Sequence, residues 1–523
     1  MILIYRIFNC SNLSDMKMLR LPFLILTFTL LCGHLHAKTD DAAKSNTFLI
    51  TDYGAVGDGE TLNTIAIQKA IDACVASGGG KVVIPSGRFL SGTILLKSNV
   101  EIHFEHNSVL LASTNVVDFP LQPMPKYRSH KDQLGGFNAL IYAEGQENIA
   151  LTGSGTIDGQ GTLHTPMPNP VAGDIDGRPR NILLISCKNI KIDGLRMLNA
   201  PIWNQHYLDC EDLFINNIYV YNHGSRNNDG IDIDGCRRVV LSSSIIDSDD
   251  DAIVLKSTGA AACEDIVITN CVVSSFCNAI KAGTETTGGF KNVSISNCVI
   301  RPSKEKGRPI WDTPRIGVSG LSLMIVDGGT LEGFTVNNLT IEGTESPIYI
   351  RLGNRARPHT AGAVVTRIGE VKNISISNVV AYDTGTWGSS ITGILGHPIK
   401  NVSLSNIQLF SKGGLKMGDF NTTVNEDENG YPHAITYGNL PSHALFIRHA
   451  ENISIDNINI ATERPDVRFP IVVDDVKGLQ IKNTIWQGAD GTKPFVKGNS
   501  VRDHSVEAPL GWTEGEFFDL IDD

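Results

Sequence analysis

Short segments that alternate apolar and polar residues recur through most of the chain. Each places apolar residues at every second position and leads into turn residues such as Asn, Gly or Asp. The segments include NIALTG from Asn148, NIKIDG from Asn189, DLFINN from Asp212, RVVLSS from Arg238, DIVITN from Asp265, NVSISN from Asn292, GFTVNN from Gly333, NISISN from Asn373, NVSLSN from Asn401, NISIDN from Asn452 and GLQIKN from Gly478. Period-two alternation predicts β-strands with one buried face.

The spacing of these segments indicates how the strands are arranged. From Asn189 to Asn292 they begin 23, 26, 27 and 27 residues apart. Strands too short to be stable alone, repeated at such intervals, predict coils stacked into a solenoid. Longer intervals fit coils that carry a long loop. The sequence therefore predicts an all-β protein, a parallel β-helix with inward Ile, Val and Leu and with Asn and Cys ladders at its bends.

The two ends of the repeat differ from its middle. TLNTIAIQKAIDACVASGGG places Ile65, Ala66, Ala70, Ile71, Ala73 and Cys74 at helical spacing, and the glycines 78–80 end the segment. We expect an N-terminal capping helix that covers the first coil. Residues 486–523 lose the repeat and are expected to form an atypical C-terminal cap. Residues 38–523 are predicted to be a single β-helix catalytic domain.

The first 37 residues resemble an export signal peptide. MKMLRLPFLILTFTLLCGHLHA has the basic residues Lys17 and Arg20, an apolar run over 21–32 and a small Ala37. The run is short for a membrane span. We expect a periplasmic or extracellular protein without a membrane span, and we favour cleavage over lipidation at Cys32 because bulky Leu31 precedes that cysteine.

Charge and cysteine content narrow the classes of partner. The net charge is -12, from 44 basic and 56 acidic residues, which argues against nucleic-acid and anionic-membrane partners. An acidic polysaccharide would need a local basic patch. Eight of the ten cysteines follow the signal region, without the paired C-x-x-C spacing of a zinc site. Small buried core cysteines are expected, in a protein that we expect to be monomeric.

Aspartates are concentrated in NNDGIDIDGCRRVVLSSSIIDSDDDAIVLKS, residues 227–257. Asp229 and Asp250 are 21 residues apart, about one coil, so they can lie along one groove, and Asp251 joins them if the chain bends there. Grouped carboxylates suit glycoside hydrolysis, in which one is protonated and another ionised. A calcium site and a polar scaffold edge are the alternatives. Asp232 and Asp234 alternate with isoleucines and are expected on a strand surface.

Residues 48–407 resemble glycoside hydrolase family 28, the polygalacturonases and their relatives. The resemblance rests on DYGAVGDGETLNTIAIQKAIDAC, GGGKVVIPSGRF, GSGTIDGQG, PIWNQHYLDCEDLFINN, NNDGIDI and DDAIVLKS. It implies a right-handed β-helix and inverting hydrolysis without a metal or organic cofactor. By position it implies that Asp250 is the general acid and that Asp229 and Asp251 hold and deprotonate the water.

The chain departs from the family pattern where substrate is bound. The family's histidine falls on Asn278, and its Arg and Lys fall on Ser322 and Met324, neither of which is cationic. Asn can hydrogen-bond but cannot carry charge. Five cationic residues could bind the substrate in place of the missing ones. The alternative for each is that it is a solvated turn residue. They are Lys256, Lys281, Arg351, Arg355 and Arg357.

Other side chains near these motifs could contact sugar. Trp203, Trp311 and Trp387 could stack on sugar rings or pack beneath loops, and His223 could line the groove or occupy a turn, as could His206. Three functions stay open. They are a hydrolase acting on a pectic or related polysaccharide other than plain polygalacturonan, a calcium-dependent β-helix lyase, and a non-catalytic carbohydrate-binding relic.

Overall fold

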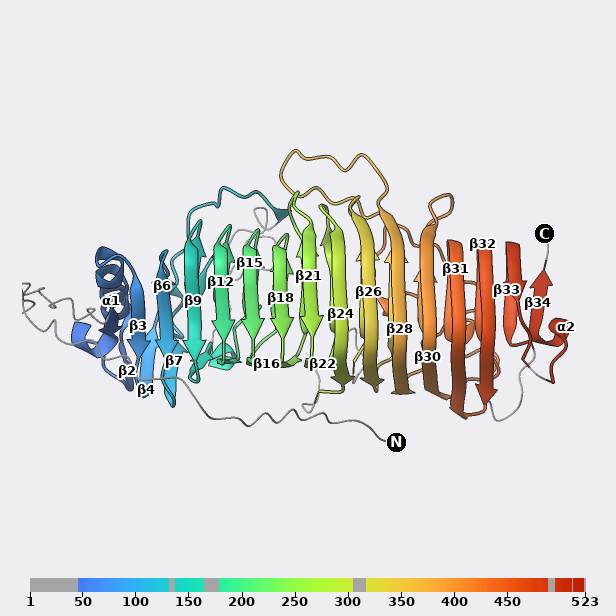
Figure 1. Ribbon diagram of the computed structural model, residues 1–523, viewed down its shortest axis with the longest axis horizontal. Coiled ribbons are helices and arrows are strands. Elements are labelled where there is room, and N and C mark those ends of the chain that lie inside the picture. Colours follow the sequence, from blue (N-terminus) through green and yellow to red (C-terminus); the bar gives the residue numbers. More distant parts are fainter. Residues whose placement is uncertain are drawn as a thin grey trace, which may run out of the picture. The chain divides into compact units, whose positions relative to one another are not determined.

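The computed structural model describes residues 46–130, 137–163, 178–303, 317–487, 494–509 and 511–521. The expected signal peptide, Cys32 included, lies outside these residues, and so does Trp311. Residues 46–523 form one compact unit, in which the strands lie side by side as successive coils along a solenoid (Figure 1). Among the described helices, none is long and apolar enough to cross a membrane.

Three parallel ladders form the faces of the solenoid, and every ladder pairing between described strands is parallel. Face A contains β5 (Ile94–Leu95), β8 (Ala139–Glu144), β11 (Arg180–Ile185), β14 (Gln205–Leu208), β17 (Ile231–Asp234), β20 (Ile253–Ser257), β23 (Asn278–Thr286), β25 (Ser319–Ile325), β27 (Ser346–Leu352) and β29 (Ser389–Thr392). Face B begins with β1 (Thr47–Leu49), β3 (Gly80–Ile84), β6 (Val100–Phe104), β9 (Glu147–Gly153), β12 (Lys188–Asp193), β15 (Glu211–Asn216), β18 (Arg237–Ser242) and β21 (Cys263–Thr269).

Face C begins with β2 (Asp58–Leu62), β4 (Gly87–Ser91), β7 (Ser108–Ala112), β10 (Thr156–Asp158), β13 (Arg196–Leu198), β16 (Tyr219–Asn222), β19 (Ile245–Ser248) and β22 (Val272–Ser275). Later strands run through two or three faces: β24 (Phe290–Arg301), β26 (Thr330–Glu342), β28 (Glu370–Thr384), β30 (Ile399–Gly413), β31 (Ser442–Arg464), β32 (Phe469–Gln487) and β33 (Val496–Val506). The ladder ends with β34 (Phe518–Ile521), so strand pairing continues into the C-terminal segment.

The core forms because each coil places the same kind of side chain at the same register. One inward column on face B consists of Ile190, Leu213, Val239, Ile266 and Val293, each at most 1% exposed. Aligned aliphatic side chains remove apolar area from water at every coil. The alternating pattern of the sequence is thus confirmed as the strand periodicity of a parallel β-helix.

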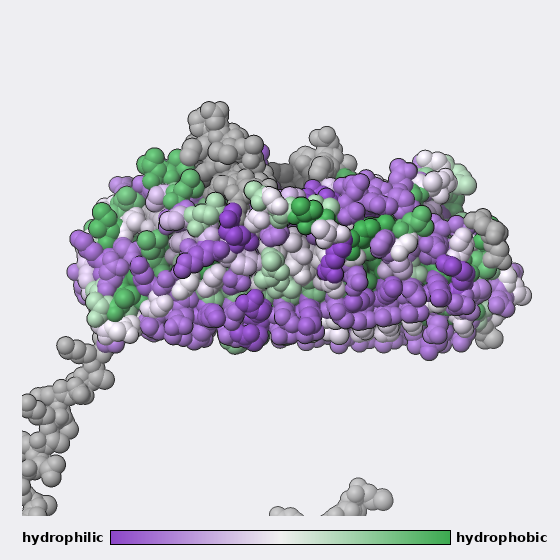
Figure 2. Space-filling view, turned by 90° about the horizontal axis from the view of Figure 1, so that it is seen from above, coloured by the Kyte–Doolittle hydropathy of each residue, from purple (hydrophilic) through white to green (hydrophobic). Residues whose placement is uncertain are grey.

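Asparagines begin many repeats because the bend there needs a left-handed backbone. Asn373, Asn401 and Asn452 have φ of 58°, 56° and 59°, a conformation that Asn adopts more readily than most residues. Their amides also form a ladder: Asn401 Nδ2 donates to Asn373 Oδ1 at 2.8 Å, and Asn452 Nδ2 to Asn401 Oδ1 at 3.0 Å. Hydrophilic residues accordingly form a band along one edge of the surface in Figure 2.

The helical segments are few and short. They are α1 (Thr64–Ala76), α2 (Glu514–Phe517), η1 (Ile50–Tyr53), η2 (Val116–Asp118), η4 (Gly161–Leu163) and η5 (Ala434–Thr436). Helix α1 packs on β1, β3, β5 and β6 at the first coils and buries Ile67, Ala70, Ile71 and Cys74. Ile65, expected on this buried face, is 72% exposed, because the helix rotates Ile67 inward instead. The eight described cysteines are all buried and unpaired.

Candidate active site

A cleft of about 250 Å³ opens over face A where β17, β20 and β23 meet the loops. It collects all three predicted aspartates, Asp229, Asp250 and Asp251, from two neighbouring coils. The other residues that line it are His130, Trp203, Asn227, Lys256, Lys281, Thr284, Glu285, Arg355, Arg357 and Tyr431. The cleft therefore combines the predicted aspartates with four basic side chains.

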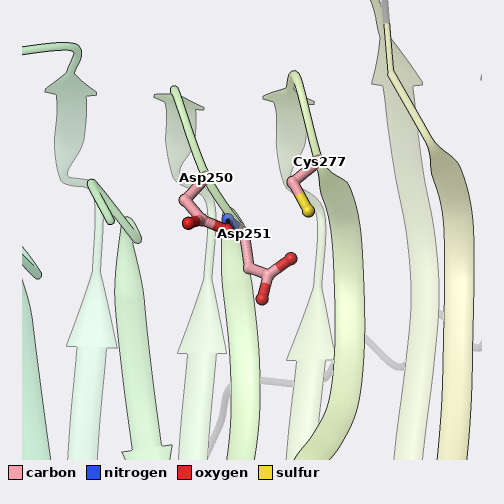
Figure 3. Close-up of side chains that lie close together, drawn as sticks. All are labelled: Asp250, Asp251 and Cys277. Carbon is pink, nitrogen blue, oxygen red and sulfur yellow. Dashed lines mark hydrogen bonds between the residues drawn. The ribbon is translucent and has the colours of Figure 1, made fainter. Parts of the chain in front are cut away.

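Asp250 and Asp251 occupy the short bend between β19 and β20, and both side chains point to the same side of the strands (Figure 3). Two serine hydroxyls hold the bend by donating to the Asp250 carbonyl, Ser248 Oγ at 2.9 Å and Ser275 Oγ at 2.5 Å. The Asp251 backbone N–H donates to Asp250 Oδ1 at 3.0 Å. This bend brings two consecutive carboxylates into one cleft.

The two carboxyl groups have pKa values shifted in opposite directions. Burial, followed by the charges of Asp229 and Asp251, raises the pKa of Asp250 well above its ordinary value. Burial alone would also raise the pKa of Asp251, but the charges of Lys281 and Lys256 and its hydrogen bonds outweigh burial and lower it. The cleft thus places a carboxyl group whose surroundings favour its protonated form beside one whose surroundings favour its ionised form.

Both oxygens of Asp251 accept hydrogen bonds from the next strand, β23. Lys281 Nζ donates to Oδ2 at 2.6 Å, and Asn278 Nδ2 donates to Oδ1 at 2.6 Å. The Asn278 amide is oriented in turn because its Oδ1 accepts from Ser319 Oγ at 2.5 Å and Ser322 Oγ at 3.1 Å. Asn278 and Lys281, expected to bind substrate, therefore hold Asp251 in place.

Asp229 and Lys256 form the other side of the cleft. Lys256 Nζ lies 3.4 Å from Asp229 Oδ2, 3.3 Å from Asp232 Oδ1 and 3.6 Å from Glu285 Oε2. The same ammonium sits 4.5 Å from the centre of the Trp203 ring. Burial lowers the pKa of Lys256, but the surrounding carboxylates outweigh burial and raise it.

Asp232 and Asp234 are fully buried, although their alternation with isoleucines suggested a strand surface. Asp234 accepts from Thr258 Oγ1 at 2.6 Å and lies 3.0 Å from His206 Nε2. Asp232 pairs with Lys256. Their side chains do point off the sheet, but the loops over face A cover them, and paired cations and hydroxyls offset the cost of burying charge.

The remaining predicted residues divide between the cleft and its supports. Arg355 and Arg357 line the cleft, and Arg351 does not. Arg351 donates from Nη2 to the carbonyls of Glu426, at 3.2 Å, and Asp427, so it holds the segment 414–441 against β27. His223 also lies outside the lining, with Nε2 3.0 Å from Asp247 Oδ1.

Two of the three tryptophans that the sequence suggests could stack on sugar rings are described, and only one of them lines the cleft. Trp203 lines the cleft and is 7% exposed. Trp387 packs in a separate apolar cluster with Tyr349, Tyr437 and Phe446. Stacking on sugar therefore stays a prediction for Trp203.

Sequence reasoning missed Tyr431, Glu285, Asn227, Thr284 and His130, which all line the cleft. Tyr431 comes from the segment 414–441, which follows Asp251 by more than 160 residues and contains none of the motifs. Glu285 lies in β23, four residues after Lys281, and a search for carboxylates near that lysine would have found it. Thr284 lies beside Glu285 in β23, and Asn227 and His130 lie outside the strands, without a distinguishing sequence pattern.

One oxygen each of Asp250 and Asp251 and the sulfur of Cys277 lie within 4.8 Å of one another (Figure 3). This donor set does not suit calcium, which takes six to eight oxygen ligands. Lys281 also places its ammonium on Asp251, and burial raises the pKa of the Cys277 thiol. The oxygen spacing is shorter than the roughly 6.5–9.5 Å typical between the acid and base of inverting glycosidases.

Comparison with known proteins identifies the family to which the chain belongs. A model of glycosyl hydrolases family 28 matches residues 74–417, about two thirds of the chain. The chain belongs to this family. It is 33% identical over 224 residues to a probable polygalacturonase of Vitis vinifera, and 30% identical over 202 residues to a probable endo-xylogalacturonan hydrolase A of Neosartorya fischeri.

These matches cover 41% and 36% of the chain and 45% of each relative, so the matched region spans less than half of either relative. A solved structure, the exopolygalacturonase from Thermotoga maritima, has a TM-score of 0.60 at 21% identity and covers 81% of this chain and 93% of its own. The family 28 exopolygalacturonase of Yersinia enterocolitica has a TM-score of 0.56 at 18% identity, covering 89% and 79%. At these identities the two structures show the shared β-helix fold.

Proposed function

We propose that this family 28 protein hydrolyses O-glycosidic bonds of a pectic or related plant polysaccharide by acid/base catalysis. The observation that carries the proposal is the pair of opposite pKa shifts on Asp250 and Asp251 within one cleft. General acid/base hydrolysis needs a carboxyl group that stays protonated near a second that stays ionised.

Asp250 is the general acid in this mechanism. Its raised pKa keeps the proton on the carboxyl group until the glycosidic oxygen accepts it, which lets the C–O bond break with a neutral leaving sugar. After transfer, Asp250 carries a negative charge beside Lys281 and Lys256, both of which stabilise that charge. The protein therefore stabilises the product state of the proton transfer.

Asp251 and Asp229 bind and deprotonate the attacking water. Because each oxygen of Asp251 already accepts a hydrogen bond, the carboxylate is better suited to polarise water than to attack carbon. The family resemblance, not the short spacing of the Asp250 and Asp251 oxygens, supports direct displacement by water with inversion at the anomeric carbon. Proton NMR of the first-formed product, before mutarotation, tests the stereochemistry: inversion gives the opposite anomer from the substrate.

The substrate that we propose differs from unsubstituted polygalacturonan. At positions where the family carries a histidine and two cations, this chain has Asn278, Ser322 and Met324. Ser322 Oγ donates to Asn278 Oδ1, and Asn278 Nδ2 donates to Asp251 Oδ1. One relative is named as a probable endo-xylogalacturonan hydrolase, which makes substituted galacturonans a natural part of the test panel.

A calcium-dependent lyase is the second candidate from the sequence. The cluster of Asp250, Asp251 and Cys277 offers two carboxylates to a calcium ion. However, Lys281 and Asn278 already donate hydrogen bonds to both oxygens of Asp251, and the third donor is a thiol, which calcium does not favour. A non-catalytic relic would have no need of a protonated and an ionised carboxyl side by side. We further propose export of the protein through residues 1–37 and action as a monomer on polysaccharide without a nucleic-acid partner.

The test uses the protein without its signal peptide, in chelator, with oligogalacturonides, xylogalacturonan, rhamnogalacturonan and neutral side-chain fragments. Wild type is compared with Asp250→Asn and with Asp249→Asn, a control one residue away whose side chain does not line the cleft. Loss of a general acid costs roughly 10²–10⁴-fold in rate. We expect that loss for Asp250→Asn alone. Equal rates for all three, or activity only with added calcium, would overturn the proposal.

A further inference from the structure

Three of the four cations that line the cleft are neutralised by protein carboxylates. Lys281 pairs with Asp251 at 2.6 Å, and Lys256 pairs with Asp229, Asp232 and Glu285. Arg357 donates to both oxygens of Asp327, from Nε at 3.0 Å and from Nη2 at 2.6 Å. None of these three groups has an unmatched positive charge to offer to a ligand.

Arg355 is the exception. It makes no hydrogen bond or ion pair to any residue in the described part of the chain, and its Nη1 is a buried donor without an acceptor. The guanidinium lies 5.1 Å from the centre of the Tyr431 ring, and both residues line the cleft. An uncompensated, partly buried guanidinium is costly in a folded protein, so its retention in the cleft points to an anion that arrives with the ligand.

We propose that Arg355 is a specificity-determining residue that binds the carboxylate of an acidic sugar unit in the cleft, with Tyr431 holding the guanidinium plane. This inference rests on the proposed hydrolase function, and it names the sugar carboxylate as the feature of the substrate that the site recognises. A planar guanidinium presents paired N–H donors that match both oxygens of a carboxylate. A neutral sugar would leave the buried Nη1 donor unpaired.

The register of face A explains why this role falls to a loop arginine. Lys281 pairs in register with Ser322, and Met324 with Arg351. Lys281 is committed to Asp251, and Arg351 to the carbonyls of Glu426 and Asp427. Arg355, four residues after Arg351 and beyond the end of β27, reaches the cleft from the loop instead.

The experiment measures ligand binding without turnover. In an Asp250→Asn background, titration calorimetry or ligand-detected NMR compares D-galacturonate with D-galactose, two probes that differ by the carboxylate. One charge-assisted contact is worth about ten- to hundredfold in affinity. We expect galacturonate to bind better than galactose by that factor, and Arg355→Met to reduce the preference to about twofold or less.

Two matched variants separate recognition from structure. Arg355→Lys keeps the positive charge but lacks the paired N–H donors of the guanidinium, so it should retain part of the preference for galacturonate over galactose. Arg367→Gln removes an exposed arginine from the same loop, one whose Nη2 donates to Thr330 Oγ1 at 3.2 Å, and should leave the preference unchanged. Because Arg355 makes no hydrogen bond or ion pair within the described residues and its guanidinium lies over the Tyr431 ring, Arg355→Met should unfold at about the same temperature as its parent or a higher one.

Equal affinity for the two sugars, no binding of galacturonate, or an unchanged preference in Arg355→Met would overturn the assignment. Marked destabilisation by Arg355→Met would also contradict it, since that would indicate a structural role. The outcome is independent of catalysis. If wild type hydrolyses nothing while the Arg355-dependent preference is present, the proposed function fails and the subsite stands. If wild type hydrolyses the substrate but shows no preference that depends on Arg355, the proposed subsite fails and the proposed function stands.

Discussion

Lys281→Met breaks the ion pair that sets the protonation state of Asp251. The ammonium and the carboxylate are 2.6 Å apart, and both side chains are 4% exposed. At an effective dielectric constant of about 20, two unit charges at that distance attract by about 6 kcal/mol. Desolvation offsets part of this attraction, so removing one partner of such a buried pair costs about 3–5 kcal/mol.

The stability loss should depend on pH with a definite sign. The pKa of Asp251 is lowered in the fold and that of Lys281 is raised, so the pair stabilises the protein between the ordinary carboxyl and lysine values, 3.8 and 10.5. Its contribution is lost as pH falls through the folded pKa of Asp251. Urea unfolding should therefore show the full difference between variant and wild type near pH 7 and a smaller one in acid.

Activity should respond in the same direction. Without the neighbouring ammonium, the pKa of Asp251 rises by about 1–3 units, which moves the acidic limb of kcat/KM against pH upward. The pKa of Asp250 also rises, because Lys281 lowers it in the wild type, so the basic limb moves up too. Lys291→Met is the control, since Lys291 pairs with Glu264 at 3.1 Å on the surface, where water and salt screen the pair and its loss should change stability little. An acidic limb that stays in place in Lys281→Met would refute the reasoning.

Three further predictions concern supports of the cleft and the core. Asn278→Ala should lower kcat more than it changes KM, by roughly tenfold for one lost hydrogen bond to a charged group, as steady-state kinetics on the hydrolysed substrate will show; an unchanged kcat would contradict the positioning role. Arg448→Gln removes donors to the carbonyls of Val424, at 2.5 Å, and Asn425, at 3.0 Å, and should speed protease cleavage within 414–441, whereas wild-type cleavage rates would contradict that anchoring role. Cys236→Ala should cost about 1–3 kcal/mol in urea unfolding with or without reductant, because a buried thiol packs as an apolar group; a reductant-sensitive wild type would contradict this.

The regular part of the molecule could be predicted from sequence because it repeats. A strand phrase such as NVSISN fixes which side chains face inward, and register then follows from the spacing between coils. The spacing between Asp229 and Asp250 likewise placed both on one face. Helix α1 shows the limit of this reasoning, because Ile65 and Ile67 both fit an apolar stripe and packing selects Ile67.

Contacts between distant loops could not be predicted in this way. Arg351 and Arg355 lie in one phrase, YIRLGNRARP, and nothing local separates their roles. Arg351 is fixed by carbonyls 75 and 76 residues further along the chain. Arg355 reaches Tyr431, which is as far away. The burial of Asp232 was equally hidden, because it depends on Lys256 from the next coil and on covering loops.

The most direct test of hydrolysis is the mass of the products formed in oxygen-18 water. The account predicts that every cleavage by wild type places one oxygen-18 atom on the anomeric carbon of the new reducing end, in chelator, and that Asp250→Asn forms this product at least about a hundredfold more slowly. Products lighter by one water molecule, with an unsaturated ring and no label, would mean elimination in place of hydrolysis and would contradict the central claim.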